Sequence, residues 1–344
     1  MPLLIEIALK SVVLVFVLLT GFAYMSLVER KVLARMQARF GPNRAGPMGL
    51  LQPLADGLKL ILKESITPRA VDIPIYFLAP VLVVIPALIL FAVIPVGSPA
   101  VVLAGGQPIL QLASNVNVGV LYVLGVMGIA VYGITLAGWA SNNKYASLGG
   151  LRASAQVISY ELGMGLSMVA VVLMAGSMSL AQIVTAQLPG QFGGVLGWFI
   201  FRQPVAAAIF AITALAETMR APFDLVEAEQ ELTAGYMTEY SGMKFALFFM
   251  GEYVKMIAVS ALFTTFFLGG WNGPFVNEVP ILSVAYFTAK VILCLLMMIW
   301  TRATLPRLRY DRLMGFGWKV LLPVGLANVM LTALLIVIGI PGYK

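Results

Sequence analysis

Apolar residues are grouped in long runs along this chain, and polar residues collect in the stretches between them. One run, PVAAAIFAITAL, starts at Pro204, and another, VILCLLMMIW, starts at Val291. Crossing about 30 Å of hydrocarbon takes about 20 helical residues. The pattern therefore predicts eight transmembrane helices, at residues 5–28, 73–95, 116–138, 155–177, 203–221, 244–268, 281–301 and 318–340.

The runs are apolar on every side, which favours helices over membrane strands. Strands of a membrane barrel alternate polar and apolar residues, whereas a lipid-exposed helix does not. Backbone groups in lipid must also pair within their own segment, as they do in a helix. The predicted fold class is an all-α integral membrane protein, a single membrane domain of residues 1–344 with amphipathic cytoplasmic surface helices.

Charged residues between the predicted spans are distributed very unevenly. Most basic residues lie in or beside four connections, at residues 29–72, 139–154, 222–243 and 302–317. Of the 22 Lys and Arg, only five lie elsewhere: Lys10, Arg202, Lys255, Lys290 and Lys344. Because cytoplasmic loops carry the excess of basic residues, these connections are expected in the cytoplasm and both termini on the periplasmic side. The N-terminus lacks a basic region and a cleavage site, so the first helix is expected to be retained.

One cytoplasmic stretch, residues 50–64, predicts a helix that is too short and too charged to cross a bilayer. Its apolar residues recur at helical spacing, and its charged residues fall on another face: Leu51, Leu54, Leu58 and Ile61 against Asp56, Lys59 and Lys63. This pattern is typical of a helix that lies at the membrane surface. The Gly- and Pro-rich string RFGPNRAGPMG precedes it and predicts ordered turns. Whether the helix is only an anchor or also helps to bind a ligand is left open by the pattern.

Composition excludes several kinds of chemistry. Hydrophobic residues make up 60% of the 344 positions and charged residues 11%, there is no histidine, and Cys294 is the one cysteine. Iron–sulfur clusters need several thiolates, and zinc and haem sites depend heavily on imidazole. No GxGxxG or GxxxxGK[ST] string marks a nucleotide site. We therefore expect no metal, cluster or cofactor to be bound by this chain.

Three carboxylates fall well inside predicted spans, several residues from the span ends: Glu161, Glu217 and Glu252. An ionised acid at mid-bilayer costs about 2.5–3.5 kcal/mol on insertion scales, so each is unlikely by chance. Counted at about 1.5 Å per residue, all three lie roughly 6–12 Å inside the cytoplasmic half of the membrane. The acids Asp224, Glu227, Glu229 and Glu231 follow at the cytoplasmic exit. Together these residues predict a polar lane that could carry protons.

Two lysines within spans extend this interpretation. Lys255 is three residues from Glu252 and shares its helix face, so it is expected to keep that acid ionised. Lys290 would carry the lane deeper into the bundle. The alternative is a set of ion pairs between helices that serve assembly only. A solvated acidic loop is likewise the alternative for residues 227–231.

Four strings resemble the characteristic sequences of one family, the H subunit of NADH–quinone oxidoreductase. This is the membrane subunit of respiratory complex I next to the peripheral arm, known as subunit 1 in mitochondria. The strings are VERKVLARMQARFGPNRAGPMGLLQPLADGLKL (28–60), GWASNNKYASLGG (138–150), RASAQVISYE (152–161) and AETMRAPFDLVEAEQELTAGYMTEYSG (216–242). The resemblance extends over the whole chain.

The resemblance implies a function for particular residues. A quinone-access chamber would be lined or supported by Glu29, Arg30, Arg39, Asp56, Phe223 and Asp224. A charged funnel for protons would contain Glu161, Glu217, Glu227, Glu229, Glu231 and Glu252. It also implies that quinone is the substrate and that FMN and the iron–sulfur clusters belong to neighbouring complex I subunits. These partners would include the peripheral subunits of the quinone site and small membrane subunits.

Two other functions remain open at this point. The first is the homologous membrane subunit of an energy-converting hydrogenase or formate hydrogenlyase, although the basic, turn-rich segment 29–69 favours the quinone enzyme. The second is a free-standing ion carrier, because buried carboxylates also coordinate sodium. A bacterial inner membrane is the expected location, and a mitochondrially encoded copy would have a similar sequence.

Overall fold

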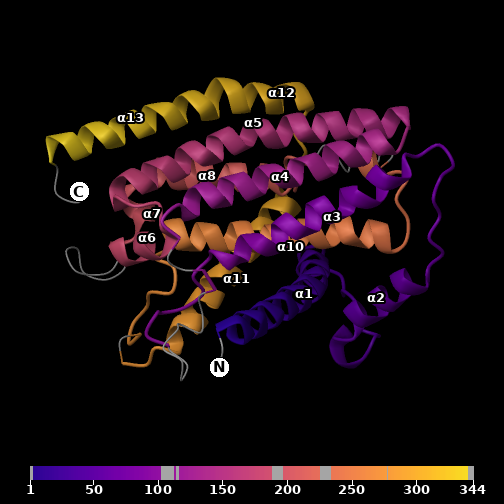
Figure 1. Ribbon diagram of the computed structural model, residues 1–344, viewed down its shortest axis with the longest axis horizontal. Coiled ribbons are helices and arrows are strands. Elements are labelled where there is room, and N and C mark those ends of the chain that lie inside the picture. The colour runs from indigo at the N-terminus through magenta and orange to yellow at the C-terminus, as the bar shows by residue number, and fades with distance from the viewer. Residues whose placement is uncertain are drawn as a thin grey trace.

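The computed structural model describes residues 3–101, 112–113, 116–187, 197–224, 234–276 and 278–339. All regular secondary structure in these ranges is helical. The principal helices are α1 (Leu3–Met36), α2 (Gln52–Leu62), α3 (Ile73–Ile89), α4 (Gly119–Ala140), α5 (Lys144–Ala175), α6 (Leu180–Ala186), α7 (Phe199–Arg202), α8 (Pro204–Glu217), α10 (Met243–Phe267), α11 (Leu282–Thr304), α12 (Tyr310–Phe316) and α13 (Leu322–Ile338). Shorter 3₁₀ turns lie at Pro47–Gly49, Leu90–Ala92 and Gly235–Met237, and a π-helical turn, Gly317–Leu321, joins α12 to α13. Figure 1 shows α3, α4, α5, α10 and α13 running roughly along the length of the molecule, whereas α1 and α11 are inclined to them.

Seven helical stretches in the described residues are long and apolar enough to cross a membrane: Ile5–Met36, Ile73–Ala92, Gly119–Ala140, Lys144–Ala175, Met243–Phe267, Leu282–Thr304 and Tyr310–Ile338. The predicted class, an all-helical membrane protein, is confirmed. The predicted span 203–221 corresponds to α8, which has only 14 residues. At 1.5 Å per residue α8 is about 21 Å long, less than the hydrocarbon thickness. The count of eight crossings therefore stays a prediction.

Several helices extend beyond their predicted boundaries. α5 begins at Lys144 rather than near residue 155, because the Asn143 side chain accepts a hydrogen bond from the Tyr145 backbone N–H at 3.0 Å and caps the helix. The predicted connection 139–154 is thereby reduced to the three residues between α4 and α5. Likewise, α1 continues to Met36, past the predicted end at 28. Charged residues end an apolar run but do not end a helix, so hydropathy alone underestimates helix length.

The helices α5 and α10 form the centre of the bundle. α5 packs against α4, α8 and α13, and α10 packs against α3 and α11. The largest apolar cluster lies among these helices and includes Met164, Met168, Phe210, Leu262 and Phe266. α1 and α13 lie at the periphery and expose many apolar side chains, as expected for surfaces that face lipid or a partner helix.

Glycines allow the backbones of α4 and α5 to approach closely. A methyl group added at Gly138 of α4 would lie 2.6 Å from the carbonyl oxygen of Ala146 and 3.0 Å from the Cα of Gly150, both on α5. One added at Gly149 would lie 2.7 Å from the Cα of Gly235. Small residues at helix interfaces are the usual means of close packing in membranes. The second contact holds the turn Gly235–Met237 against α5 and so positions Tyr236.

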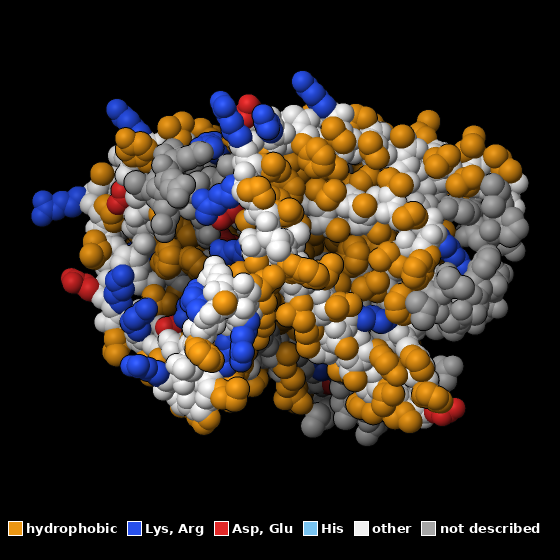
Figure 2. All heavy atoms as spheres, turned by 180° about the vertical axis from the view of Figure 1, so that it is seen from behind, with side chains coloured by type: hydrophobic (Ala, Val, Ile, Leu, Met, Phe, Trp, Pro, Cys, Tyr) orange, Lys and Arg blue, Asp and Glu red, His pale blue; other side chains and the backbone are white. Residues whose placement is uncertain are grey.

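The predicted amphipathic surface helix is present as α2, which lies apart from the long helices in Figure 1. Leu54, Leu58 and Ile61 on its apolar face are all more than half exposed in the chain. Figure 2 shows Lys and Arg side chains gathered toward one end of the molecule, the end that carries α2, while hydrophobic side chains cover most of the remaining face. The basic residues are thus segregated in space as well as in sequence.

Candidate functional site

The candidate site is built around a sharp turn at the end of α8, residues 216–224, which we call the α8 elbow. Every residue of the α8 elbow is buried. Met219, two residues after the end of α8, adopts φ = 50°, in the left-handed region that residues other than glycine rarely occupy. Such backbone strain is of order 1–3 kcal/mol and persists only where surrounding contacts fix it. The turn directs Glu217 and Arg220 toward different neighbouring helices.

Glu217 forms a buried ion pair with Lys255 of α10. The Lys255 ammonium lies 2.6 Å from Glu217 Oε1, and the two residues are 9% and 1% exposed. The second carboxylate oxygen, Oε2, has no hydrogen-bond partner among the described residues. The salt bridge of Lys255 is thus with Glu217 of another helix, while Glu252, the predicted neighbour on α10, lines the same cavity. α8 packs against α10 and presents a more deeply buried carboxylate, which needs a counter-charge more than Glu252 does.

Glu252 is satisfied differently. Its Oε1 accepts a hydrogen bond from the Tyr236 hydroxyl at 3.0 Å. The two acids, Lys255 and Tyr236 line a cavity of about 20 Å³ whose other walls include Val83, Ala130 and Ile134. A cavity needs about 10–15 Å³ to hold one water molecule with polar partners, so this one has room for a water. The arrangement brings two carboxylates, an ammonium and a phenol around one small polar space.

Glu161 of α5 lies on a different side of the same region. Its Oε1 would be 3.4 Å from a methyl group at Gly128 of α4, so the carboxylate lies directly over that glycine. It is the one charged residue in the lining of an apolar groove of about 490 Å³, formed with Leu124, Leu162, Leu166, Leu322 and Leu326 among others. The groove and the small cavity share no lining residue, although α4 contributes to both. Glu161, although predicted to belong to the same lane as Glu217, therefore lines the groove and not the small cavity.

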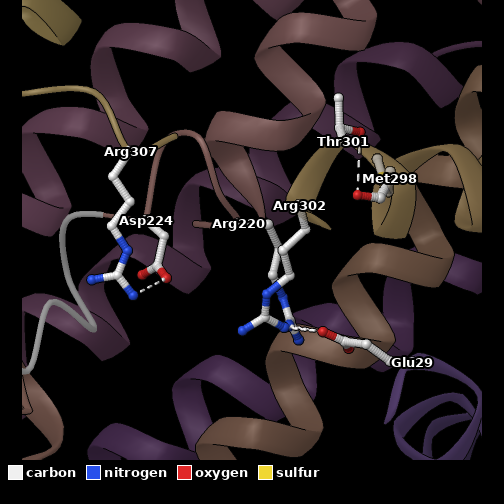
Figure 3. A network of polar contacts seen from close by, with 7 residues as sticks. All are labelled: Glu29, Arg220, Asp224, Met298, Thr301, Arg302 and Arg307. Carbon is white, nitrogen blue, oxygen red and sulfur yellow. Dashed lines mark hydrogen bonds and ion pairs between the residues drawn. The ribbon is translucent and has the colours of Figure 1, made fainter. Parts of the chain in front are cut away.

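A second charged cluster lies at the other face of the α8 elbow (Figure 3). Glu29 of α1 accepts hydrogen bonds through Oε1 from Arg220, at 2.9 Å, and from Arg302 in the last turn of α11. The Arg220 guanidinium also lies 4.4 Å from the centre of the Tyr253 ring on α10. Glu29 and Arg220 are both buried. Two guanidinium groups therefore share one buried carboxylate.

The end of the α8 elbow is held by the chain after α11. Asp224, which is buried, pairs with Arg307 at 3.1 Å. The Leu308 backbone N–H donates to the Pro222 carbonyl at 3.0 Å. The Phe223 ring packs against Tyr160 of α5 with ring centres 5.4 Å apart. Phe223 and Asp224, predicted for the quinone chamber, thus lie beside the cluster that contains Glu29.

The remaining predicted chamber residues lie on the exposed side of α1 and α2. Arg30 and Asp56 form a partly exposed ion pair at 2.7 Å that joins the two helices. Gln52 supports it by donating to Asp56 Oδ1 at 3.1 Å. Arg39 instead bonds to Gln37 at 2.8 Å, and no contact in the described residues joins it to Arg30 or Asp56. The structure therefore brings Arg30 and Asp56 together and leaves Arg39 separate.

Lys290, predicted to extend the lane deeper into the bundle, is not among the residues that line the Glu217 cavity. Its ammonium donates to the carbonyls of Leu268, Gly270 and Asn272 at 2.8, 2.9 and 2.7 Å, and so caps the C-terminal end of α10. It also lies 4.4 Å from the Trp198 ring. Glu252 and Leu268 are separated by about 24 Å along α10 at 1.5 Å per residue. Glu227, Glu229 and Glu231 lie outside the described residues.

Sequence reasoning missed three partners of the site: Tyr236, Arg302 and Arg307. Both arginines were interpreted only as markers of the cytoplasmic side. The signal that could have identified them is the number of acids, because each acid predicted to be buried needs a cation nearby. Tyr236 had a weaker signal, a phenol between two glycine-containing turns close to an acidic stretch. No group of three or more Cys, Asp or Glu that could hold a metal occurs in the described part of the chain.

These features define a polytopic α-helical membrane protein with two buried charged clusters joined by one turn. The sequence profile of the NADH dehydrogenase family matches residues 9–333. The NADH-quinone oxidoreductase H subunit of Protochlamydia amoebophila is 52% identical over 91% of this chain and 92% of its own length. An H subunit of the same enzyme from Geobacter metallireducens is 51% identical over 96% of this chain and 97% of its own. One from Koribacter versatilis is 49% identical over 95% and 96%. The chain belongs to the family of NADH-quinone oxidoreductase H subunits, and the predicted resemblance is confirmed.

Proposed function

We propose that this chain is the membrane-embedded H subunit of a proton-pumping NADH:quinone oxidoreductase in a bacterial inner membrane, with both termini on the periplasmic side. The relatives that carry this name are bacterial and match it nearly from end to end. In this proposal FMN and the iron–sulfur clusters are held by partner subunits. The chain contributes the quinone-access chamber and a carboxylate path that couples quinone reduction to proton translocation.

The observation that carries the proposal is that one buried turn contacts both charged clusters. Within the α8 elbow, Glu217 pairs with Lys255 on one face, and Arg220, three residues later, pairs with Glu29 on the other. Coulomb interactions between charges are many times stronger in a buried site than in water. A change in charge or position at the Glu29 cluster therefore has a direct route to Glu217.

The proton path would begin at the Glu217 cavity. A carboxylate with a free oxygen, a second acid and a phenol around space for one water are the groups that a proton relay needs. Glu161, facing its own groove, would pass protons toward the neighbouring membrane subunits. Glu227, Glu229 and Glu231 are assigned to the cytoplasmic mouth of this path by their position in the sequence. Lys290 would extend this path deeper into the bundle, although its ammonium also caps the C-terminal end of α10.

The quinone chamber would lie between the Glu29 cluster and α2. A quinone has a polar headgroup and a long apolar tail, so its path needs charged or polar groups beside exposed apolar surface. Asp224 of the α8 elbow and Glu29 of α1 supply the charged groups, and the apolar face of α2, together with the Phe223 ring beside Asp224, supplies the apolar surface. The Arg30–Asp56 pair would hold α2 in place, and Arg39 would act at the chamber's outer edge. Peripheral subunits would close the chamber from the cytoplasm.

The proposal is tested by Glu217→Gln in the assembled complex. Because the amide cannot carry a titrating proton, proton translocation per NADH oxidised with quinone should fall at least about fivefold. Oxidation of NADH by a hydrophilic acceptor that bypasses quinone should stay within about twofold, since it uses only the peripheral arm. Both rates are measured in membrane vesicles with a pH-sensitive dye and an NADH absorbance assay.

Glu6→Gln is the matched control. Glu6 is also a glutamate in a membrane helix paired with a lysine, Lys10, at 2.7 Å, but it lies at the opposite end of α1 from Glu29. It should translocate protons like the unaltered complex. Normal translocation by the Glu217→Gln complex would refute the proposed path.

The two other functions have separate outcomes. An assembly purified through this chain that exchanged hydrogen instead of oxidising NADH would identify the hydrogenase-type subunit. Ion transport by the chain alone in lipid vesicles would identify a carrier. NADH-dependent quinone reduction by the purified assembly is the result that the proposal expects.

A further inference from the structure

Gln156, in the middle of α5, connects the two ends of the α8 elbow through a single side-chain amide. The residue is fully buried, and its Nε2 donates to the carbonyl of Ala216 at 3.0 Å and to the carbonyl of Phe223 at 2.9 Å. Ala216 directly precedes Glu217, and Phe223 directly precedes Asp224. One amide group thus holds the residue before each of two functional acids.

Among the described residues, the side chain of Gln156 makes hydrogen bonds only to the α8 elbow. Tyr160, four residues later on the same face of α5, packs on Phe223. This face of α5 is therefore the surface against which the α8 elbow packs. The other amide atom, Gln156 Oε1, is buried and has no hydrogen-bond partner among the described residues. Buried amide groups are normally satisfied, and an unpaired acceptor is unfavourable. The position of the side chain is therefore set by its two bonds to the α8 elbow rather than by a complete network of its own.

We propose that Gln156 is a positioning residue that couples the Glu217–Lys255 pair to the Phe223–Asp224 end of the α8 elbow by fixing the distance between Glu217 and the Phe223–Asp224 pair. This inference rests on the proposed function, since it assigns a role within the same site. When Phe223 or Asp224 is displaced by events in the chamber, the amide passes the displacement to Ala216 and so to the Glu217–Lys255 pair. Without the amide, the two ends of the turn move independently.

The first test is Gln156→Met, which keeps the length of the side chain and removes both hydrogen bonds. Its matched control is Gln203→Met, at the opposite end of α8. Gln203 is also buried, donates to Thr332 at 2.8 Å and accepts from Asn328 at 3.1 Å, so it loses the same number of bonds. Both variants are assayed in the assembled complex for quinone reduction, for the KM for quinone and for protons translocated per NADH.

Gln156→Met should lower protons translocated per NADH about threefold or more, with kcat reduced and KM within about twofold, because coupling is lost rather than substrate affinity. Gln203→Met should keep the proton ratio, whatever its effect on the amount of assembled complex. Equal proton ratios in the two variants would overturn the inference, because Gln156 would then only contribute to packing.

The second test is Gln156→Glu, which remains informative if the Met variant does not assemble. A protonated carboxyl has one O–H donor and an ionised carboxylate has none. Protonation therefore returns one of the two hydrogen bonds, so the coupling of this variant, relative to the unaltered complex, should rise partway as pH falls and be lost as pH rises. A ratio that does not change with pH would overturn the inference, since a merely structural role gives no such dependence.

Glu217→Gln separates the two proposals. If Glu217→Gln translocates protons normally, the proposed path itself fails. If Glu217→Gln is impaired while Gln156→Met behaves like Gln203→Met, only the positioning role of Gln156 fails.

Discussion

Glu217 is the most deeply buried carboxylate in the described part of the chain, and the Lys255 ammonium is its counter-charge. Removing one partner of a buried ion pair typically costs about 3–5 kcal/mol, because it leaves an uncompensated charge in a medium that solvates it poorly. Removing both partners together avoids that penalty. The ion pair is therefore detected by comparing the stability of single and double substitutions.

We expect Lys255→Met to lower the temperature at which the purified assembly denatures, and Lys255→Met combined with Glu217→Gln to recover most of that loss. The comparison is a double-mutant cycle, followed by thermal denaturation of the detergent-solubilised complex. Arg30→Met is the control, since its pair with Asp56 is half exposed and such pairs contribute about 0–1 kcal/mol. A double variant less stable than Lys255→Met alone would contradict the ion pair.

At this scale the sequence predicts which residues matter better than it predicts their partners. An acid in an apolar run is conspicuous, so Glu161, Glu217 and Glu252 could all be identified from the pattern. The partner of Lys255 could not, because spacing along one helix favours Glu252 and the actual partner comes from another helix. Pairing between helices depends on packing geometry that no local pattern contains.

At the scale of elements, the close crossing of α4 and α5 positions the turn Gly235–Met237, which carries Tyr236. Gly138 meets Gly150 with their backbones nearly in contact, and Gly149 meets Gly235 in the turn that carries Tyr236. A larger residue at Gly138 or Gly150 forces the two helices apart, and one at Gly149 forces the turn away from α5, because the nearest atoms are backbone and cannot rotate away. The spacing of the small cavity therefore depends on glycine.

Gly138→Ala should reduce the amount of assembled complex in membranes and lower its denaturation temperature by several degrees. Its Cβ would lie 2.6 Å from the Ala146 carbonyl oxygen, so a backbone must move. Gly125→Ala in the same helix is the control, because its Cβ would meet no atom within 4 Å and alanine is the better helix former by about 1 kcal/mol. Equal losses in the two variants would show that close packing at Gly138 is not the cause.

Most elements could be predicted, and the exceptions have identifiable reasons. The long apolar runs predicted seven spans that lie near helices of the structure, and the helical spacing of apolar residues predicted α2. The early start of α5 was missed because Lys144 and Arg152 interrupt the hydropathy without breaking the helix. The early end of α8 was missed because the left-handed Met219 is not a residue that usually marks a helix end.

At the scale of the whole molecule, tertiary contacts show how the chain passes along the bundle despite the short α8. After α5, the Gln187 side chain accepts a hydrogen bond from the Gly269 N–H at 3.0 Å, which places this part of the chain beside the C-terminal end of α10. At the start of α10, the Tyr76 hydroxyl donates to the Glu239 carbonyl at 2.7 Å, beside the start of α3. α8 and its elbow therefore carry the chain from one end of the bundle toward the other.

This path supports an even number of crossings, although α8 falls short of the usual length. The α8 elbow is buried and its backbone is partly irregular, which membranes tolerate where protein covers it. Met178, between α5 and α6, and Val279, between α10 and α11, should then lie on the same side of the membrane. Arg309, after the 23-residue helix α11, should lie on the other side with the basic residues.

Single cysteines at these three positions, in a Cys294→Ser background, provide the test. Each position is well exposed in the chain, Arg309 most of all with 81% of its side chain accessible. Cysteines at 178 and 279 should react with a membrane-impermeant maleimide added to spheroplasts, and the cysteine at 309 should react only after detergent opens the bilayer. If α8 crosses the membrane, two crossings, α8 and α10, separate residue 178 from residue 279, and if it does not, only α10 separates them. Labelling of these two positions from opposite sides would therefore refute the eight-crossing topology. Labelling of 309 from outside would refute the orientation, because the positive-inside rule places that connection in the cytoplasm.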